Sequence, residues 1–341
     1  MIRAGVIGYG YWGPNLARNF AECPEARLVA VSDRRPERLA LAQTRYPGIQ
    51  ASTDYRALLA DSAIDAVAIC TPVATHFELA TEALRAGKHV LVEKVLTATS
   101  EQAERLIEEA DRRGRVLIVD HTFVYSAPVA KIRELVLNNA LGEVYYYDSV
   151  RVNLGLFQRD VNVVWDLAVH DLSIMDYVLG TRPVAVSATG MSHVSGAPEN
   201  VAYLTFFFDR DLIAHIHVNW LAPVKVRKTL IGGSQKMIVY DDLEPSEKVK
   251  VYDKGVMLSH DAEELYRMRV GYRTGDMWAP QVGMKEPLQA EVAHFIRCIE
   301  QGERPLTDGH AGLYIVRSLE AATKSMGERG RPVELKGGQS S

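Results

Sequence analysis

The sequence predicts an α/β protein in which a doubly wound parallel sheet precedes an α+β domain with a large, mostly antiparallel open sheet. Three observations carry this prediction. Short β-rich segments alternate with helical patterns up to about Thr122, a glycine-rich turn follows the first of them, and long strands close together dominate afterwards. A chain of 341 residues exceeds one average domain, so two are expected.

Apolar runs in the first part are expected to be strands buried on both faces of a sheet. They are Ala4–Ile7, Leu28–Val31, Ala66–Cys70, His89–Val92 and Val116–Val119. The helical patterns between them are Pro14–Phe20, Pro36–Arg45, Phe77–Ala86 and Ser100–Arg113. Ser100 is expected to cap the last of these helices, and Gly87 and Gly114 fall where helix C-caps belong. Repeated strand–helix units predict parallel strands with right-handed crossovers.

After Thr122 the order of elements changes. The expected helices are Ala127–Asn138, Val163–Leu179, Pro287–Gln301 and His310–Met326. The expected strands are Val144–Val152, Pro183–His193, Val201–Phe208, Leu212–Leu221, Lys225–Ile231 and Lys236–Tyr240. We therefore expect a first domain over 1–122, a second over 123–336 that binds substrate and supports oligomerisation, and a disordered tail over 337–341.

Composition excludes several classes of protein. The net charge of −4 provides no field that would attract nucleic acid or anionic lipid. No apolar run approaches the roughly 18 residues that a membrane helix needs, and the N-terminus does not resemble a signal peptide. Cys23, Cys70 and Cys298 have no paired spacing, which disfavours disulfides and a zinc site. A cytoplasmic protein without a metal is expected.

A Gly-x-Gly-x-x-Gly motif runs from Gly8 to Gly13, directly between the first predicted strand and the first helix. Its glycines permit a tight turn and close approach of a pyrophosphate to the helix N-terminus, so a Rossmann dinucleotide-binding domain is predicted. Asp33 ends the next strand, where the acid that binds the adenosine ribose belongs. It favours NAD. Arg34 and Arg35 follow at once and could hold a 2′-phosphate, so NADP remains open.

Polar residues follow two further strands at the same edge of the predicted sheet. Thr71 and Pro72 end one strand, and His76 begins the helix after it. Glu93 and Lys94 end the next strand. Doubly wound sheets bind ligands at the carboxyl ends of their strands, so an active-site role for this charged pair is favoured over an exposed structural one.

Together these motifs resemble the Gfo/Idh/MocA oxidoreductase family. The residues that carry the resemblance are Gly8–Gly13, Thr71-Pro72-x-x-x-His76, Gly87–Lys94 and Asp166-x-x-x-His170-Asp171, spread over nearly the whole chain. The resemblance implies an enzyme that binds NAD or NADP and oxidises or reduces a ring carbon of a sugar, a cyclitol or a nucleotide-linked sugar. It also implies that Lys94, Asp166 and His170 form the catalytic set.

The chain departs from the family pattern after the lysine, where Val95 replaces the family's proline. Proline makes a cis bond before it accessible, whereas a cis bond before any other residue costs about 2.5–4 kcal/mol. We therefore expect a trans Lys94–Val95 bond, with local strain as the alternative.

The i,i+4 spacing of Asp166 and His170 places both side chains on one helix face. Histidine can move a proton at neutral pH, and a nearby carboxylate can orient it and stabilise its charged form. Such a pair is more often an ordinary surface pair, but the predicted dinucleotide site favours catalysis here.

Further residues are expected to contact ligands. Arg151 and Asn153 share a strand face and could contact sugar hydroxyls or a phosphate, while Tyr125 and Trp165 could wall the sugar; packing roles are the alternatives. Expected cofactor contacts are Gly8, Gly10, Tyr11, Trp12, Gly13, Asp33, Arg34, Thr71, Pro72, His76, Glu93, Lys94 and His121. Expected substrate contacts are Lys94, Tyr125, Arg151, Asn153, Trp165, Asp166 and His170.

The predicted activity is hydride transfer between NAD and a sugar ring carbon. The family resemblance favours C3 of a nucleotide sugar of the UDP-N-acetylglucosamine type, with an inositol or free sugar as the alternative substrate. Two other classes stay open on the same fold, an NAD-dependent glycosidase and a dinucleotide-sensing regulator.

His215 and His217 share one polar face of a strand, and we place Asn219 and Trp220 with them. No third ligand is evident nearby, so a metal site is disfavoured against a solvated face or a subunit interface. We expect this face to pair with a second copy in a homodimer or homotetramer.

Overall fold

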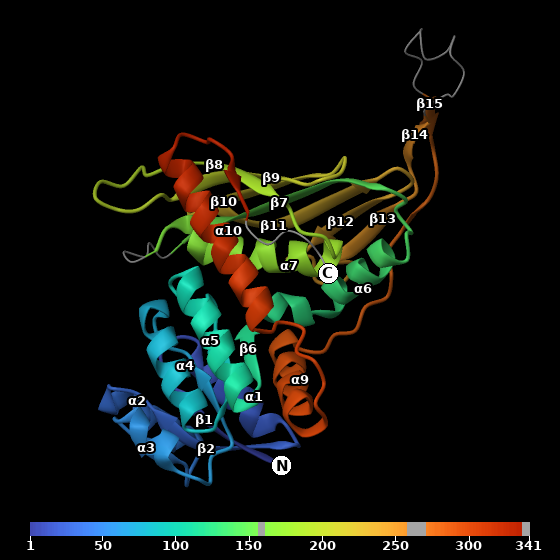
Figure 1. Ribbon diagram of the computed structural model, residues 1–341. Helices are drawn as coiled ribbons and strands as arrows, with labels where there is room; N and C mark the ends of the chain where they lie inside the picture. The colour runs from blue at the N-terminus through green and yellow to red at the C-terminus, as the bar shows by residue number, and fades with distance from the viewer. Residues whose placement is uncertain (156–160, 258–270, 336–341) are drawn as a thin grey trace. The chain divides into compact units, whose positions relative to one another are not determined.

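The computed structural model describes residues 1–155, 161–257 and 271–335, and these divide into two compact units (Figure 1). Unit 1 contains Met1–Ser126 and Lys285–Arg317, and unit 2 contains Ala127–Met284 and the chain from Ser318 onward. Residues 285–317, which the sequence predicts to lie in the second domain, pack with the first one in the structure, so unit 1 is discontinuous. The expected disordered tail, 337–341, lies outside the described residues.

Unit 1 is built on a parallel sheet with the strand order β3-β2-β1-β4-β5-β6 among the described residues. The order reverses between β1 and β4, which confirms the predicted doubly wound sheet. Its strands are β1 (Ile2–Ile7), β2 (Ala26–Ser32), β3 (Gln50–Ser52), β4 (Ala66–Ile69), β5 (His89–Glu93) and β6 (Leu117–Asp120). Its helices and short turns are α1 (Gly13–Glu22), α2 (Pro36–Arg45), α3 (Tyr55–Ala60), η1 (Val73–Thr75), α4 (His76–Arg85), α5 (Ser100–Arg113), η2 (Thr122–Tyr125) and α9 (Pro287–Gln301).

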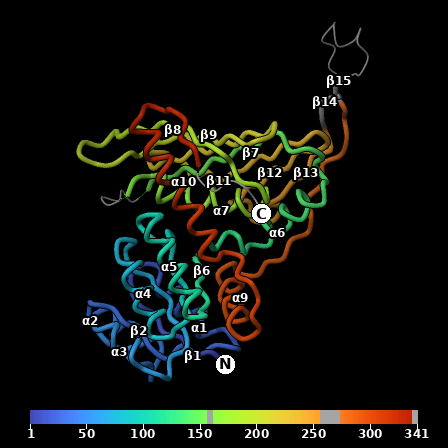
Figure 2. Tube along the Cα trace, in the orientation of Figure 1, coloured from blue at the N-terminus to red at the C-terminus, as the bar shows by residue number. Residues whose placement is uncertain are grey.

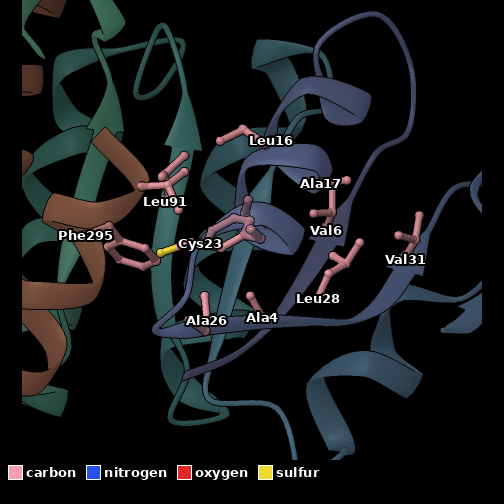
Figure 3. Close-up of a cluster of buried hydrophobic side chains, with 14 of the residues drawn as sticks. Ala4, Val6, Leu16, Ala17, Cys23, Ala26, Leu28, Val31, Leu91 and Phe295 are labelled. Carbon is pink, nitrogen blue, oxygen red and sulfur yellow. The ribbon is translucent and has the colours of Figure 1, made fainter. Parts of the chain in front are cut away.

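Helices cover both faces of this sheet, which explains the uninterrupted apolar runs of its strands. On one face, Ala4 lies in a buried cluster with Leu16 of α1 and Phe295 of α9 (Figure 3). On the other face, Gly5 lies against Leu58 of α3. Because α9 buries its apolar side in this cluster, it belongs to unit 1 despite its distance along the chain.

The ends of α5 show how closely local signals fix the elements. Thr99 caps the helix by accepting a hydrogen bond from the Gln102 N–H, so the expected cap at Ser100 is wrong by one residue. Gly114 ends the helix in the left-handed conformation, with φ +60°, as expected.

Unit 2 is built on a larger sheet with the order β16-β13-β12-β11-β7-β10-β9-β8-β17 among the described residues. Its pairs are antiparallel except for β7 with β10, which confirms the predicted mostly antiparallel sheet. The strands are β7 (Val144–Leu154), β8 (Ala185–Met191), β9 (Val201–Phe207), β10 (Ile213–Asn219), β11 (Leu221–Gly233), β12 (Met237–Asp241), β13 (Val249–Tyr252), β16 (Met277–Trp278) and β17 (Val333–Glu334). A small hairpin of β14 (Gly255–Met257) and β15 (Gly271–Arg273) lies beyond β13 (Figure 2).

The helical segments of unit 2 are α6 (Ala127–Leu137), η3 (Val164–Ala168), which is a π-helical turn, and α7 (Val169–Leu179). Helix α10 (Gly309–Gly327) is divided between the units after Arg317. Within the part of the chain that the structure describes, no helix has the length and apolar character that a bilayer crossing requires.

Strand β10 alternates as predicted. Ile216 is fully buried, whereas His215 and His217 are half-buried on the opposite face, where Tyr203 of β9 stacks on His217 with ring centroids 4.4 Å apart. The placement of Trp220 on this polar face is wrong. Trp220 is fully buried. Successive side chains of an extended strand point to opposite faces, so Trp220 lies on the same face as the buried Ile216 and opposite the two histidines.

Candidate active site

The glycine turn after β1 forms a cradle that side chains would fill. Gly8 has φ +93°, and a Cβ there would lie 2.6 Å from the Cys70 carbonyl oxygen. A Cβ on Gly13 would lie 2.0 Å from the Gly8 carbonyl oxygen. No side chain among the described residues caps the N-terminus of α1, so its N–H groups can receive an anion. This geometry fits the pyrophosphate of a dinucleotide.

Asp33 lies at the end of β2 beside this cradle, and its carboxylate is already hydrogen-bonded on both oxygens. Oδ2 accepts from the Tyr9 N–H at 2.7 Å and from Arg35 Nη2 at 3.1 Å. Oδ1 accepts from the N–H and Nε of Arg35, both at 3.0 Å. Burial raises the pKa of Asp33, but the hydrogen bonds from Arg35 and Tyr9 and the charge of Arg35 outweigh burial and lower it. Arg34, the predicted contact, is exposed; Arg35 is the arginine that engages the acid.

The loops after β4 and β5 are joined by His76. Its ring nitrogens lie 2.8 Å from the backbone oxygens of Thr71 and Val95, and the residue is fully buried. Burial lowers its pKa, although the carbonyls oppose this effect. The buried ring therefore lies between the two loops, where the neutral imidazole donates to one of the two carbonyls at a time, and this placement favours a positioning role over the predicted cofactor contact. Pro72, in contrast, is exposed beside the cradle.

Glu93 ends β5, and Lys94 follows it; both side chains are half-buried. The ammonium of Lys94 acts electrostatically on Asp120 and His121, at the end of the neighbouring strand β6. The Lys94–Val95 peptide bond is cis, so the expectation of a trans bond is wrong.

The end of β6 carries two polar residues that are almost fully buried, Asp120 and His121. The Trp12 indole N–H and the Thr122 hydroxyl both donate to the Asp120 carboxylate. Neither ring nitrogen of His121 has a hydrogen-bond partner among the described residues, and burial, with the charge of Lys94, lowers its pKa to about 3. A neutral imidazole with unused nitrogens fits the predicted contact with a polar ligand.

In unit 2, Asp166 lies in the π-turn η3 and His170 in the first turn of α7, so the predicted pair sits on consecutive helical segments. The indole N–H of Trp220 donates to Asp166 Oδ2 at 3.1 Å. Both members of the pair are half-buried. The buried indole thus fixes the carboxylate that is expected to orient the histidine.

Arg151 does not have the role predicted for it. It is buried on β7, where Nε donates to Asp171 Oδ2 at 2.7 Å and Nη2 donates to Oδ1 at 3.3 Å. Ser149 donates to the same carboxylate at 2.6 Å. The fully buried ion pair links β7 to α7, so this arginine is not presented to a sugar. Asn153, two residues along the strand, is half-buried and remains a candidate.

The two predicted aromatic walls differ. The Tyr125 hydroxyl lies 2.9 Å from Thr307 Oγ1, and its ring packs against His294 and the core of unit 1, which corresponds to the packing alternative. Trp165 is half-buried, and its indole N–H donates to Thr323 at 3.0 Å. Its ring therefore remains a candidate for contact with substrate in unit 2.

Two residues of the site were missed. Asp120 directly precedes the predicted His121 at a strand end, so its position could have marked it. Glu291 of α9 lies against Asp120 and had no sequence signal, because the contact depends on how α9 packs. No group of three or more His, Cys, Asp or Glu side chains in the described ranges is arranged to hold a metal, and His215 instead contacts Asp148 at 3.2 Å.

Comparisons with known proteins give a consistent result. Residues 2–121 match an oxidoreductase family with an NAD-binding Rossmann fold, and residues 129–239 match the GFO/IDH/MocA C-terminal domain. UDP-N-acetylglucosamine 3-dehydrogenase of Acidithiobacillus ferrooxidans is 29% identical over 317 residues, which cover 91% of this chain and 93% of that protein. Myo-inositol 2-dehydrogenase of Thermotoga maritima is 26% identical over 352 residues, which cover 98% of each.

Solved structures agree in fold. The structure of the Acidithiobacillus ferrooxidans enzyme matches with a TM-score of 0.80 and 25% identity, covering 95% of this chain and 97% of that one. Levoglucosan dehydrogenase in complex with NADH matches with a TM-score of 0.82 and 20% identity, covering 98% and 99%. With the glycine cradle, Asp33 and both matched domains in place, the chain belongs to the Gfo/Idh/MocA family of NAD-binding oxidoreductases.

Proposed function

We propose that the protein is an NAD-dependent dehydrogenase that oxidises the C3 hydroxyl of a nucleotide-linked sugar such as UDP-N-acetylglucosamine. The observation that carries this proposal is the similarity to a dehydrogenase of that name over nine-tenths of both chains, at 29% identity. The presence of Lys94, Asp166 and His170 together supports an enzyme over a dinucleotide-sensing regulator.

The proposed roles follow from the chemistry of each side chain. NAD, when bound, accepts the hydride from the carbon that carries the hydroxyl. His170 takes the hydroxyl proton, since an imidazole exchanges protons near neutral pH. Asp166, held by the Trp220 indole, orients His170 and stabilises its charged form. Lys94 supplies a cationic hydrogen-bond donor, the kind of group that stabilises negative charge developing on an oxygen.

A cyclitol or free sugar is the second candidate substrate. The specific observation in its favour is the Thermotoga maritima myo-inositol 2-dehydrogenase, which aligns with 98% of this chain at 26% identity. In addition, Arg151 is paired with Asp171, so its guanidinium does not serve to hold the phosphate of a nucleotide sugar. The catalytic roles proposed above are the same for either substrate.

Substrate choice is tested by following NADH absorbance with UDP-N-acetylglucosamine, myo-inositol and glucose. We expect turnover of the nucleotide sugar. His170→Ala should lower kcat by about two to four orders of magnitude, the usual effect of removing a general base, with unchanged NAD affinity. Ser173→Ala, on the same helix, is the matched control and should stay within about threefold of the wild type, since it loses only one hydrogen bond to a backbone oxygen.

Turnover of myo-inositol or glucose without turnover of the nucleotide sugar would contradict the preferred substrate and leave the dehydrogenase intact. Near-full activity of the His170 variant would contradict the proton route. Release of sugar from an aryl glycoside without net NADH would instead select an NAD-dependent glycosidase.

Cofactor choice is predicted to depend on Arg35. The ribose hydroxyls of NAD must replace Arg35 on Asp33, whose oxygens already accept four hydrogen bonds, whereas a 2′-phosphate could pair with the Arg35 guanidinium. Arg35→Ala should therefore raise the ratio of NAD affinity to NADP affinity by about tenfold or more, as measured by isothermal titration. Arg34→Ala is the neighbouring control and should change the ratio less than about twofold. Equal effects of the two substitutions would rule this role out.

The open face of the unit 2 sheet is proposed as the contact between copies of this chain. Tyr203, Phe207 and Ile213 are 38–48% exposed there, beside the half-buried His215 and His217. An apolar and imidazole-rich face is favourable to cover, and closed symmetric assembly is the common solution. Light scattering at micromolar concentration should report a dimer or tetramer, and a monomer would refute the contact.

A further inference from the structure

Unit 1 contains a pair of buried carboxyl groups to which the proposed mechanism gives no role. Asp120 ends β6 with 2% of its surface exposed, and Glu291 of α9 is 0% exposed. The two carboxyls lie within hydrogen-bonding reach of each other, although 171 positions separate them in the sequence.

The hydrogen bonds around the pair are unequal. Asp120 accepts from the Trp12 indole and the Thr122 hydroxyl. Neither oxygen of Glu291 has a well-formed hydrogen bond among the described residues; the Thr122 hydroxyl, which donates to Asp120, is close enough to lower the pKa of Glu291 but does not offset burial. Two ionised carboxyls in contact and shielded from water repel each other strongly, so one of them holds a proton. A proton on Glu291 supplies the missing donor and leaves Asp120 as the carboxylate that its two donors require.

The other charged and titratable groups around the pair agree with this assignment. Burial, followed by Asp120, raises the pKa of Glu291 well above its usual range, and Glu93 at the end of β5 adds a further negative charge. From η2, Tyr125 is neutral, since burial raises its pKa well above 10.0. Burial leaves the pKa of Asp120 raised as well, but Thr122, Trp12, Glu291 and the ammonium of Lys94 all act in the opposite direction. For Glu291, burial and the charges of Asp120 and Glu93 act together, so Glu291 is the better proton holder.

We propose that Glu291 is a positioning residue of the active site: its protonated carboxyl donates to Asp120 and fixes the carboxylate that anchors Trp12 and interacts with the charge of Lys94. Trp12 belongs to the glycine turn, and Lys94 is the proposed catalytic lysine, so one buried proton supports both. The link to Lys94 rests on the proposed function; the proton on Glu291 and the anchoring of Trp12 do not.

The first experiment measures stability against pH and needs no substrate. Above the usual pKa of a glutamate, the folded protein holds a proton on Glu291 that the unfolded chain has released, so this group makes the protein less stable as pH rises. Glu291→Gln keeps a donor and cannot ionise. Its Tm should exceed that of the wild type by a margin that widens from about pH 5 to about pH 8, reaching on the order of 3 °C.

Glu286→Gln, at the residue that directly precedes α9, is the matched control. Glu286 accepts from Arg18 at 2.5 Å, and that hydrogen bond lowers the pKa of Glu286, so its charge stabilises the folded protein at neutral pH. Its Tm should equal or fall below that of the wild type at about pH 8, which is the opposite sign. A Glu291→Gln variant that is no more stable than the wild type at that pH would mean that Glu291 is ionised, and would overturn the proposal.

The second experiment tests positioning. Glu291→Gln should keep NAD affinity and kcat within about twofold, because the amide donates in place of the acid. Glu291→Leu has no donor and should weaken NAD binding and lower kcat by about tenfold, with little change in the KM of the sugar, as expected when catalytic groups are slightly misplaced. Wild-type NAD affinity and kcat in the leucine variant would overturn the positioning role. If no sugar is oxidised at all, the proposed function fails, while the Tm series and NAD titration still decide this inference.

Discussion

The first turn of α1 begins directly against the carbonyl oxygen of Gly8, at a distance that leaves no room for a side chain on Gly13. This approach brings the helix N-terminus onto the end of β1 and turns Leu16 into the core of unit 1. It also leaves Gly8 in a left-handed conformation beside the carbonyl of Cys70. One constraint, the close approach of Gly13 to Gly8, therefore sets the turn, the packing of the helix and the direction of its N–H groups. The cofactor site depends on this constraint.

Buried polar groups extend this constraint to the rest of the sheet edge. The Trp12 indole links the glycine turn to Asp120 at the end of β6, and His76 links the loops after β4 and β5. Loops that are tied to one another by buried hydrogen bonds keep their positions when a ligand arrives. This preorganisation allows dipoles and charges to act on a transition state without first rearranging. The same reasoning makes the buried proton of Glu291 relevant to function, because Asp120 accepts the hydrogen bond that holds Trp12 of the glycine turn.

Local patterns predicted much of this fold. The bounds of α2, α5 and α9 agree with the expected helices, because apolar periodicity, proline at the start and glycine at the end are local signals. The packing of α9 on the first sheet was not predictable in the same way, since it depends on tertiary contacts with α1 and β1. Strand β3 and helix α3 were missed because they are only three and six residues long.

Some of the site residues could likewise be predicted from local patterns, whereas others depend on tertiary contacts. The glycine turn and Asp33 follow from spacing, because the chemistry of a dinucleotide fixes both. Arg151 does not have the expected ligand contact, because it forms an ion pair with Asp171 of α7. Its position on a strand does not predict that partner. The conformation of the Lys94–Val95 bond also differs from the expectation based on valine. Sequence patterns identify which edge of the sheet is functional, whereas the pairing of buried charges requires the structure.

The close approach of Gly13 to Gly8 creates the NAD site, and the Gly13→Ala variant tests this dependence most directly. The added Cβ would lie 2.0 Å from the Gly8 carbonyl oxygen, so the turn must open. We predict that isothermal titration of the variant, with its folding checked by circular dichroism, will show NAD affinity reduced by about a hundredfold or more. Wild-type affinity in a folded Gly13→Ala variant would contradict the account.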